Sequence, residues 1–181
     1  RELRISTPNS GGYSIDWRAR FTAGKEGAVL DRTPMPGEPN GQVNGGYAGL
    51  GVRMASQPLV MSVVCSTGLV TQFARDRARP SASAVGCNFA EGTRDAGGIA
   101  IFSAPANAGE NAPWYLVNSA EMRFACAAIL APKTISLPSG GKLELHYQIA
   151  VSPRAWTVES LQTAVAVWLR TSRATGAQPP R

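Results

Sequence analysis

Apolar and polar residues alternate with a period of two along much of the chain, which predicts β-strands that bury one face. The clearest case is the segment from Gly12 to Gly24. On one face it carries Ile15, Trp17, Ala19 and Phe21, and on the other Ser14, Asp16, Arg18 and Arg20. This segment is therefore expected to be a long, half-buried strand.

Shorter apolar segments, separated by glycine and proline, predict further strands. One begins at Ala28 and stops at Pro34, because proline cannot donate to a ladder, and a loop rich in glycine and proline follows. The next strands are expected at 49–55, 58–66, 68–76, 97–105 and 121–130. The last of these also fits a short helix, but the flanking Pro132 favours the strand. Residues 78–98 are ambiguous, and 106–119 has the composition of a polar loop.

Residues 134–153 predict a β-hairpin whose turn is the segment from Pro138 to Gly141. In the second strand of this hairpin the two faces differ in chemistry. Leu143, Leu145, Tyr147 and Ile149 share the apolar face, and Glu144, His146 and Gln148 share the polar face.

Only residues 157–171 show the helical period. Thr157 is a good N-cap, and an apolar stripe at helical spacing follows it. The stripe consists of Leu161, Ala164, Val165, Trp168 and Leu169. A disordered tail is expected at 171–181. About nine strands and one C-terminal helix, without a βαβ alternation, predict an all-β antiparallel β-sandwich in a single domain over residues 1–170.

The net charge of +6 raises the question of a nucleic-acid partner. The arginines are scattered, however, and the densest group, Arg75 to Arg79, contains Asp76. Nucleic-acid binders usually combine a basic face with interleaved aromatics or a recognisable reading motif, and this chain has neither. We therefore expect no nucleic-acid partner, and an anionic small molecule stays a candidate ligand. No apolar run approaches the roughly 18 residues of a membrane span, so no membrane contact is expected.

The chain has few residues of the types that metal and redox sites require. The cysteines, Cys65, Cys87 and Cys126, have neither metal-type nor redox-type spacing, and buried small side chains fit them better than a disulfide pair. The single histidine, His146, excludes any site that needs two imidazoles. No metal and no cofactor are therefore expected.

The segment from Asn44 to Met54 is rich in glycine and raises the question of a phosphate loop. Phosphate-binding loops open onto a helix, whereas this segment runs into a strand, so that function is not expected. Two interpretations stay open. The glycines serve the geometry of the fold alone, or they also leave a hollow beside Arg53 in which a ligand is bound.

Two further residues stand out by their position. His146 lies on a polar strand face beside Glu144 and Gln148, which fits an ordinary solvated histidine or one that faces a ligand. Trp114 lies in the polar loop, where it either anchors the folded loop or stacks on a sugar ring. In the second interpretation the nearby hydrogen-bond partners are Asn107, Glu110 and Asn111. The chain shows no nucleophile elbow, and no spacing selects a pair of carboxylates.

Three blocks of the chain, in order, resemble the bacterial PmoA-like family of proteins. The block DRTPMPGEPNGQVNGGYAGLGVRM, at 31–54, is similar to that family's RTP…GGYAGLS-R block. GGIAIFSAPANAGENAPWYLV, at 97–117, resembles GIAIFDHPxNPRxPTPWHV, and LPSGGKLELHYQIAVSP, at 137–153, resembles LPAGESLTLRYRVVVHDG. The positions that match the family are Arg32, Gly45, Gly46, Tyr47, Gly49, Arg53, Asn107, Pro113 and Trp114.

This resemblance implies a β-sandwich akin to the supersandwich of galactose-mutarotase-like proteins, which bind or act on carbohydrates. It also implies that the chain corresponds to the C-terminal portion of a longer protein, because the family carries a histidine-rich block upstream. Two of the family's histidine positions are occupied here by Ala104 and Tyr115. The family's frequent label "methane oxygenase" does not fit, because such copper enzymes are membrane-embedded and need several histidines.

The function that the resemblance implies is that of a sugar- or glycoside-processing enzyme, or of a domain of one. The expected site consists of the ligand-binding residues Tyr47, Arg53, Asn107 and Trp114 and of His146 as the catalytic residue. Arg53 would bind a sugar hydroxyl or carboxylate, Trp114 would stack on the ring, and Asn107 and His146 would hydrogen-bond or carry a proton. The alternative is a non-catalytic carbohydrate-binding or protein-interaction module that has lost the histidine-rich half.

Overall fold

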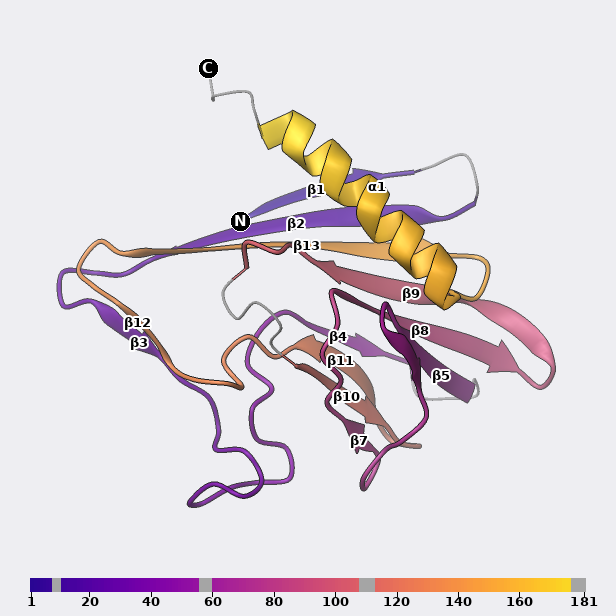
Figure 1. The fold of residues 1–181 in the computed structure, drawn as a ribbon, viewed down its shortest axis with the longest axis horizontal. Coiled ribbons are helices and arrows are strands. Elements are labelled where there is room, and N and C mark those ends of the chain that lie inside the picture. The colour runs from indigo at the N-terminus through magenta and orange to yellow at the C-terminus, as the bar shows by residue number, and fades with distance from the viewer. Residues whose placement is uncertain (8–10, 56–59, 108–112, 177–181) are drawn as a thin grey trace.

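The structure, a computed structural model, describes residues 1–7, 11–55, 60–107 and 113–176, with side chains up to residue 172. Within these residues the chain forms thirteen strands and one helix (Figure 1). The strands are β1 Glu2–Ser6, β2 Tyr13–Thr22, β3 Ala28–Leu30, β4 Gly51–Met54, β5 Val60–Cys65, β6 Gly68–Val70, β7 Arg77–Ala78, β8 Ala84–Glu91, β9 Arg94–Ser103, β10 Trp114–Asn118, β11 Arg123–Ala127, β12 Ile135–Leu137 and β13 Lys142–Ser152. The helix α1 spans Val158–Gly176.

Two antiparallel sheets face each other, and a two-stranded ribbon extends from them (Figure 1). Seven strands form the long sheet in the order β1–β2–β13–β9–β8–β5–β6, four form the short sheet in the order β4–β11–β10–β7, and β12 pairs with β3. The predicted all-β antiparallel sandwich with a C-terminal helix is therefore confirmed. The predicted number of about nine strands is too low, because short segments that carry little periodicity also pair as strands.

The main core lies between the inner faces of the two sheets. From the long sheet it receives Val63, Cys65, Val85, Cys87, Ile101, Leu145 and Tyr147, and from the short sheet Met54, Trp114, Leu116 and Ala125. These residues alternate along their strands with residues that point outward, as a period of two requires. The faces predicted for β2 are confirmed, because Ala19 is buried and Trp17 packs on the core, while Arg20 is exposed.

The helix α1 covers the outer face of the long sheet (Figure 1). Its buried residues Leu161, Val165 and Trp168 pack against Val64, Ala84, Ala100 and Phe102. Thr157 caps the helix as predicted, since its Oγ1 accepts a hydrogen bond from the Ser160 amide at 3.1 Å and the Ser160 hydroxyl accepts one from the Thr157 amide at 2.8 Å. In the part of the chain that the structure describes, no helix is long and apolar enough to cross a membrane.

The predicted hairpin of β12 and β13 is wrong, although its turn exists. The Gly141 amide donates to the Pro138 carbonyl at 2.7 Å, but the strands on either side of this turn diverge. β12 pairs with β3, and β13 pairs with β2 along most of its length. The physical reason is that β13 needs a neighbour of equal length whose apolar face also meets the main core, and β2 is that strand.

Two predicted unstructured segments contain regular structure. The predicted loop 106–119 includes β10, which begins at Trp114, while residues 108–112 lie outside the described part of the chain. The predicted disordered tail is also wrong for 171–176, because α1 continues to Gly176, and residues 177–181 are not described. The ambiguous segment 78–98 forms β8 and the start of β9, which pair with each other.

The cysteines behave as the sequence predicts. Cys65, Cys87 and Cys126 are all free thiols, and all are buried. Burial raises the pKa of each thiol to about 12, and the pKa of Cys87 is raised further by its proximity to Cys65. These side chains therefore act as small apolar core residues.

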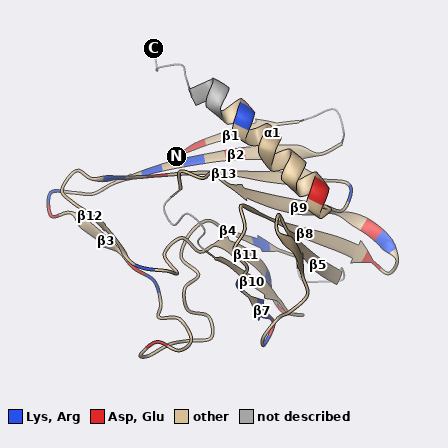
Figure 2. Ribbon diagram, in the orientation of Figure 1, with Lys and Arg blue, Asp and Glu red and all other residues tan. Residues whose placement is uncertain are grey.

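One end of the β2–β13 pair extends beyond its neighbours. β1 pairs with β2 only as far as Arg18, and β9 pairs with β13 only from Tyr147 onward. Residues 19–22 and 142–145 therefore form a two-stranded projection, which we call the arm. Lys and Arg are prominent along this end of the long sheet (Figure 2).

Candidate functional site

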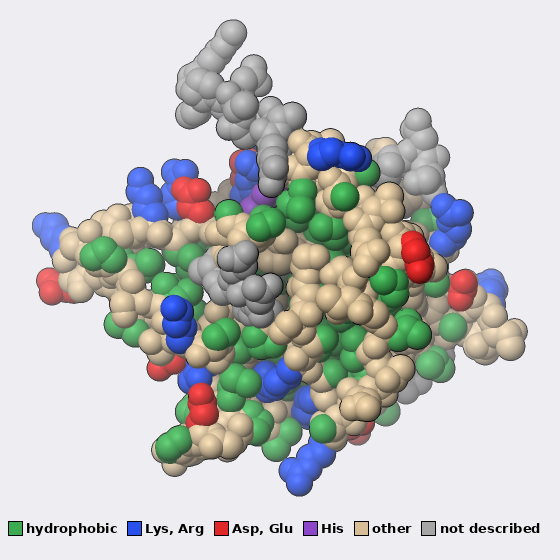
Figure 3. Space-filling view, in the orientation of Figure 1, with side chains coloured by type: hydrophobic (Ala, Val, Ile, Leu, Met, Phe, Trp, Pro, Cys, Tyr) green, Lys and Arg blue, Asp and Glu red, His purple; other side chains and the backbone are tan. Residues whose placement is uncertain are grey.

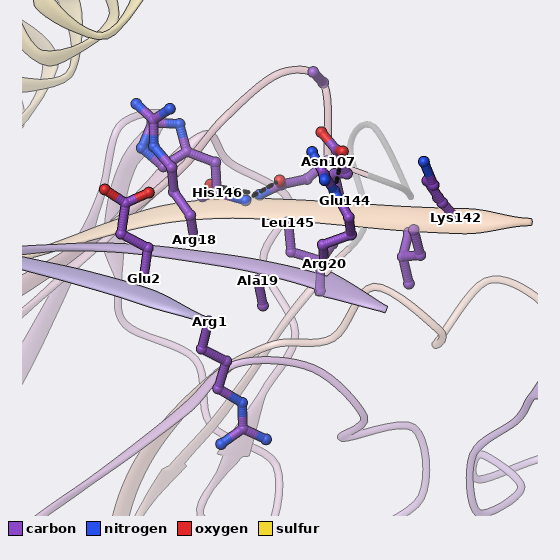
Figure 4. A pocket seen from close by; sticks show the side chains of 12 residues that line it. Arg1, Glu2, Arg18, Ala19, Arg20, Asn107, Lys142, Glu144, Leu145 and His146 are labelled. Carbon is purple, nitrogen blue, oxygen red and sulfur yellow. Dashed lines mark hydrogen bonds and ion pairs between the residues drawn. The ribbon is translucent and has the colours of Figure 1, made fainter. Parts of the chain in front are cut away.

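The polar residues of β2 and β13 meet on the outer face of the long sheet, where the arm begins. The register of the two strands places His146 opposite Arg18 and Glu144 opposite Arg20. Residues opposite one another in an antiparallel pair point to the same face, so these four side chains rise from one surface. Figure 4 shows this surface from close by.

At the base of the arm, His146 is hydrogen-bonded to Asp16. His146 Nε2 lies 2.8 Å from Asp16 Oδ2, and the two side chains are only 20% and 19% exposed. The same carboxylate accepts a hydrogen bond from Trp168 Nε1 at 3.1 Å and one from Arg18 Nε at 3.2 Å. The Asp16 carboxylate, on β2, therefore joins side chains from β2, β13 and α1.

These contacts keep Asp16 ionised. Burial acts to raise the pKa of the carboxyl, but the hydrogen bonds from His146, Trp168 and Arg18 and the charge of His146 outweigh it. The pKa of Asp16 therefore lies below its ordinary value of 3.8. An ionised carboxylate only accepts hydrogen bonds, so His146 Nε2 carries the proton and Nδ1 is the basic nitrogen of the neutral ring. Nδ1 has no hydrogen-bond partner among the described residues.

The backbone of His146 is fixed from the other side by Asn107. The Asn107 Oδ1 accepts a hydrogen bond from the His146 amide at 2.7 Å, and its Nδ2 donates to the His146 carbonyl at 2.8 Å. Nδ2 also donates to Ser103 Oγ at 3.0 Å. The His146 carbonyl also accepts a hydrogen bond from the Ala104 amide at 3.1 Å, whereas the His146 amide, beyond the end of the β9–β13 ladder at Tyr147, is paired by Asn107. Asn107, expected to bind a ligand directly, therefore uses its amide to position the backbone of His146.

A groove of about 900 Å³ runs along the arm from His146 (Figure 4). The charged residues that line it are Arg18, Arg20, Lys142, Glu2 and Glu144, together with Arg1, whose side chain points to the opposite side of the sheet in Figure 4. Arg20 and Glu144 form an exposed ion pair at 2.7 Å. Cations outnumber carboxylates in this lining, which favours a ligand that carries negative charge. Figure 3 shows the histidine among charged side chains at this end of the long sheet.

Metal chemistry finds no support in the described residues, which contain no group of three or more His, Cys, Asp or Glu side chains able to hold an ion.

The predicted combination of Arg53 with His146 is wrong. In β4, Val52 and Met54 contact the main core, so Arg53 points outward from the short sheet. His146 points outward from the long sheet, on the side that α1 covers. The whole core lies between the two residues, so the expected catalytic site that combines Arg53 with His146 is not formed.

The hollow predicted beside Arg53 is filled. A Cβ on Gly51 would lie 2.6 Å from the Phe124 ring, so this ring occupies the space. A Cβ on Gly45 would collide with the carbonyl oxygen of Pro34, and one on Gly49 with that of Ala127. The glycines therefore allow close packing of backbone segments, as the first of the two interpretations states. Gly49 and Gly51 also line an apolar cavity of about 650 Å³, but it lies on the core side of the arm.

The two aromatic site candidates also lie away from the groove. Trp114 is not in a loop, since it starts β10, is 1% exposed, and donates from Nε1 to the Ala82 carbonyl at 2.9 Å. No face of its ring is open for stacking on a sugar, and the interpretation of Trp114 as an anchor fits the structure better. Tyr47 is exposed, but it packs on Tyr115 on the outer side of the short sheet.

Sequence reasoning missed the partners of His146. Asp16 was one of several carboxylates that no spacing distinguished, and Trp168 was assigned to the apolar stripe of the helix. The available signal was that Asp16 and His146 both lie on the polar faces of predicted strands. Their proximity depends on the pairing of β2 with β13, which was not predicted.

Comparison with known proteins gives one match. A family model described as "Family of unknown function (DUF6807)" matches residues 1–166. No curated protein and no solved structure matches the chain.

Proposed function

The chain belongs to DUF6807, a family of unknown function, and from that premise we propose that it binds an acidic carbohydrate and transfers a proton on it through His146. The observation that carries this proposal is the Asp16–His146 pair at the head of a groove rich in cationic side chains. The similarity of the chain to the PmoA-like family, whose fold is akin to that of carbohydrate-binding sandwiches, agrees with it.

The lining of the groove supports a polar, multiply hydroxylated ligand. Sugar hydroxyls both donate and accept hydrogen bonds, and the groove offers guanidinium and ammonium donors together with the carboxylates of Glu2 and Glu144. The excess of cations supports a ligand with a carboxylate or another anionic group. An Arg side chain such as that of Arg20 can hold such a group through two parallel hydrogen bonds.

His146 supplies the proton transfer in this proposal. In the neutral ring Nδ1 accepts a proton from a sugar hydroxyl, and the Asp16 carboxylate stabilises the imidazolium that forms. The deprotonated oxygen forms a bond to carbon as the C–O bond to the leaving group breaks, and the imidazolium gives the proton to the leaving oxygen, so the protein ends the cycle unchanged. Trp168, whose ring centre lies 4.9 Å from that of the imidazole, and the hydrogen bond to Asp16 restrict the ring to one orientation, while Asn107 fixes the backbone that carries it.

A second candidate function is carbohydrate binding without catalysis. The observation that favours it is the ion pair between Glu144 and Arg20, because it leaves no free carboxylate beside His146 to act as a second acid or base. In that case the groove recognises the sugar, and His146 serves only as a hydrogen-bonding residue.

A thermal-shift panel tests the proposal. Uronic acids are expected to raise the melting temperature, whereas the corresponding neutral hexoses are expected to raise it less. Arg20→Gln should reduce the shift that uronic acids cause. The matched control is Arg94→Gln, since Arg94 is also an exposed, ion-paired arginine but lies at the turn between β8 and β9, outside the groove.

Two results decide between the candidates. Absence of any shift with acidic saccharides would remove both functions. If His146→Gln binds the saccharide normally and the wild-type protein does not convert it, the non-catalytic function is correct.

A further inference from the structure

A second cavity, of about 710 Å³, lies between α1 and the outer face of the long sheet. It is lined by the continuation of the same strand, β13, although the groove and the cavity share no lining residue. Along β13 the outward-facing residues are Glu144, His146, Gln148 and Ala150, and the first two line the groove while the last two line the cavity. Alternate residues of a strand are about 7 Å apart, so the groove, His146 and the cavity follow one another at intervals comparable to a sugar ring.

The cavity differs from the groove in its chemistry. Arg154 is the one charged residue in its described lining, whereas charged side chains dominate the groove. Its lining includes Trp156, which is half-buried, and Trp168, which is 3% exposed, together with Ser14 and Gln148 on the strands below the helix. A surface that combines aromatic carbon with neutral hydrogen-bonding groups fits an uncharged polar ring.

The polar groups of Ser14 and Gln148 are uncommitted. Neither the Gln148 amide nor the Ser14 hydroxyl has a side-chain hydrogen bond within the described residues, although both lie on strands that are otherwise fully paired. The amide offers two donors and one acceptor, and the hydroxyl offers one donor. These are the partners that the hydroxyls of a neutral sugar require.

Trp156 is held rigidly in the wall of this cavity. The Trp156 amide donates to Asn88 Oδ1 at 2.7 Å, and Asn88 Nδ2 donates to the Trp156 carbonyl at 2.9 Å. The indole lies against Gly86 and Gly98, because a Cβ on Gly98 would come within 2.8 Å of its Cδ1 atom. Asn88 thus fixes Trp156 in the same way that Asn107 fixes His146. A preorganised aromatic wall lowers the entropy lost on binding.

We propose that this cavity binds a neutral sugar unit of the same ligand whose acidic unit lies in the groove. The inference rests on the proposed function, and it makes the ligand an oligosaccharide or glycoside rather than a free monosaccharide. It also places His146 Nδ1 at the junction of the two units, so that proton transfer takes place at or next to the bond that links them.

Calorimetric titration of the full chain tests this inference with three probes. The probes are glucuronic acid, a disaccharide of glucuronic acid linked to a neutral hexose, and a neutral disaccharide. The acidic disaccharide is expected to bind about tenfold more tightly than glucuronic acid, because the second unit adds its own contacts. The neutral disaccharide should bind most weakly.

A pair of helix variants assigns that gain to the cavity. Val167 is exposed on α1 and lines the cavity, so Val167→Trp fills the space from a position where the fold tolerates a larger side chain. This variant should bind the acidic disaccharide no better than glucuronic acid. Ala166→Trp adds the same side chain at an exposed position outside the cavity and should keep the full gain. Gln148→Leu, which removes the amide at similar volume, should lose part of the gain.

Each outcome is decisive. If glucuronic acid binds and the added hexose gives no gain, or if Val167→Trp and Gln148→Leu both keep the gain, the neutral subsite is wrong while the groove stands. If no acidic saccharide binds at all, the proposed function itself fails, and the inference fails with it.

Discussion

The outer faces of the two sheets differ in what their polar groups do. On the short sheet, the Asn44 side chain accepts hydrogen bonds from Tyr115 and Arg77, and the Arg79 guanidinium lies 4.5 Å from the centre of the Tyr115 ring. On the long sheet, His146 Nδ1 has no hydrogen-bond partner within the described ranges and lies on a residue that lines an open groove. The polar groups of the first face hold loop and sheet together, whereas on the second face Asp16, Arg20 and Glu144 are paired and His146 Nδ1 stays available.

This difference explains why the most conspicuous sequence segment is not the best site. The glycines between Asn44 and Met54 mark places where backbone segments lie too close for a Cβ. Such crowding leaves a strong pattern in the sequence. A single Asp–His contact leaves none, because each residue is ordinary in its own segment. A conspicuous pattern therefore indicates steric constraint more directly than it indicates chemistry.

The largest expected effect concerns catalysis. His146→Gln should lower the turnover of the acidic saccharide that stabilises the wild-type protein by about 100-fold or more, because the general base is removed. Arg53→Gln, on the other face, should leave turnover unchanged. Turnover and binding of both variants can be measured with the same saccharide. A loss of turnover in Arg53→Gln equal to that in His146→Gln would reverse the comparison of the two faces.

The next effect concerns stability on the short-sheet side. Gly45→Ala should lower the free energy of unfolding by about 3 kcal/mol, because its Cβ meets the Pro34 carbonyl and the backbone has to move. Gly24→Ala, where no atom lies within 4 Å of the added Cβ, is the matched control and should change stability little. Urea denaturation of both variants checks this prediction. Equal stability of the two variants would contradict the steric role of the glycine segment.

The pH dependence of the free energy of unfolding should also differ between variants on the two faces. The lowered pKa of Asp16 stabilises the folded protein above about pH 3.8, and this contribution is lost as the pH falls through the folded-state pKa. Asp16→Asn should therefore cost about 2 kcal/mol at pH 7, and the difference from wild type should shrink below pH 3.8.

The comparison for Asp16→Asn is Asn44→Ala. Its hydrogen bonds to Arg77 and Tyr115 involve no carboxylate, so its cost should not shrink below pH 3.8 as that of Asp16→Asn does. Urea denaturation at several pH values provides the measurement. A pH-independent cost for Asp16→Asn would mean that the carboxylate contributes nothing in its ionised form.

The smallest expected effect is that of the exposed ion pair on the arm. Both side chains, Arg20 and Glu144, are 63% exposed, so Arg20→Gln should change the free energy of unfolding by less than about 0.5 kcal/mol. The same variant should weaken the binding of acidic saccharides. A large loss of stability without a loss of binding would assign Arg20 a structural role, like that of the arginines on the other face.

Much of the fold follows from local patterns. The alternation in 12–24 and in the second half of 134–153 correctly predicts which face of β2 and β13 is buried, and the cap and apolar stripe correctly predict α1. β10 was missed because Trp114 and Tyr115 follow a run of loop-forming residues, although aromatic and β-branched residues continue through Val117 and favour a strand.

The sequence by itself determined that His146 lies on a polar strand face, because side-chain direction in a strand depends only on the position along it. It did not determine that Asp16, 130 positions away, lies beside it. That contact required β13 to pair with β2 rather than with β12, the strand that precedes it in the chain. Strand pairing depends on which apolar faces fill the common core. Local chemistry thus set the direction of each side chain, and only tertiary packing brought the two side chains together.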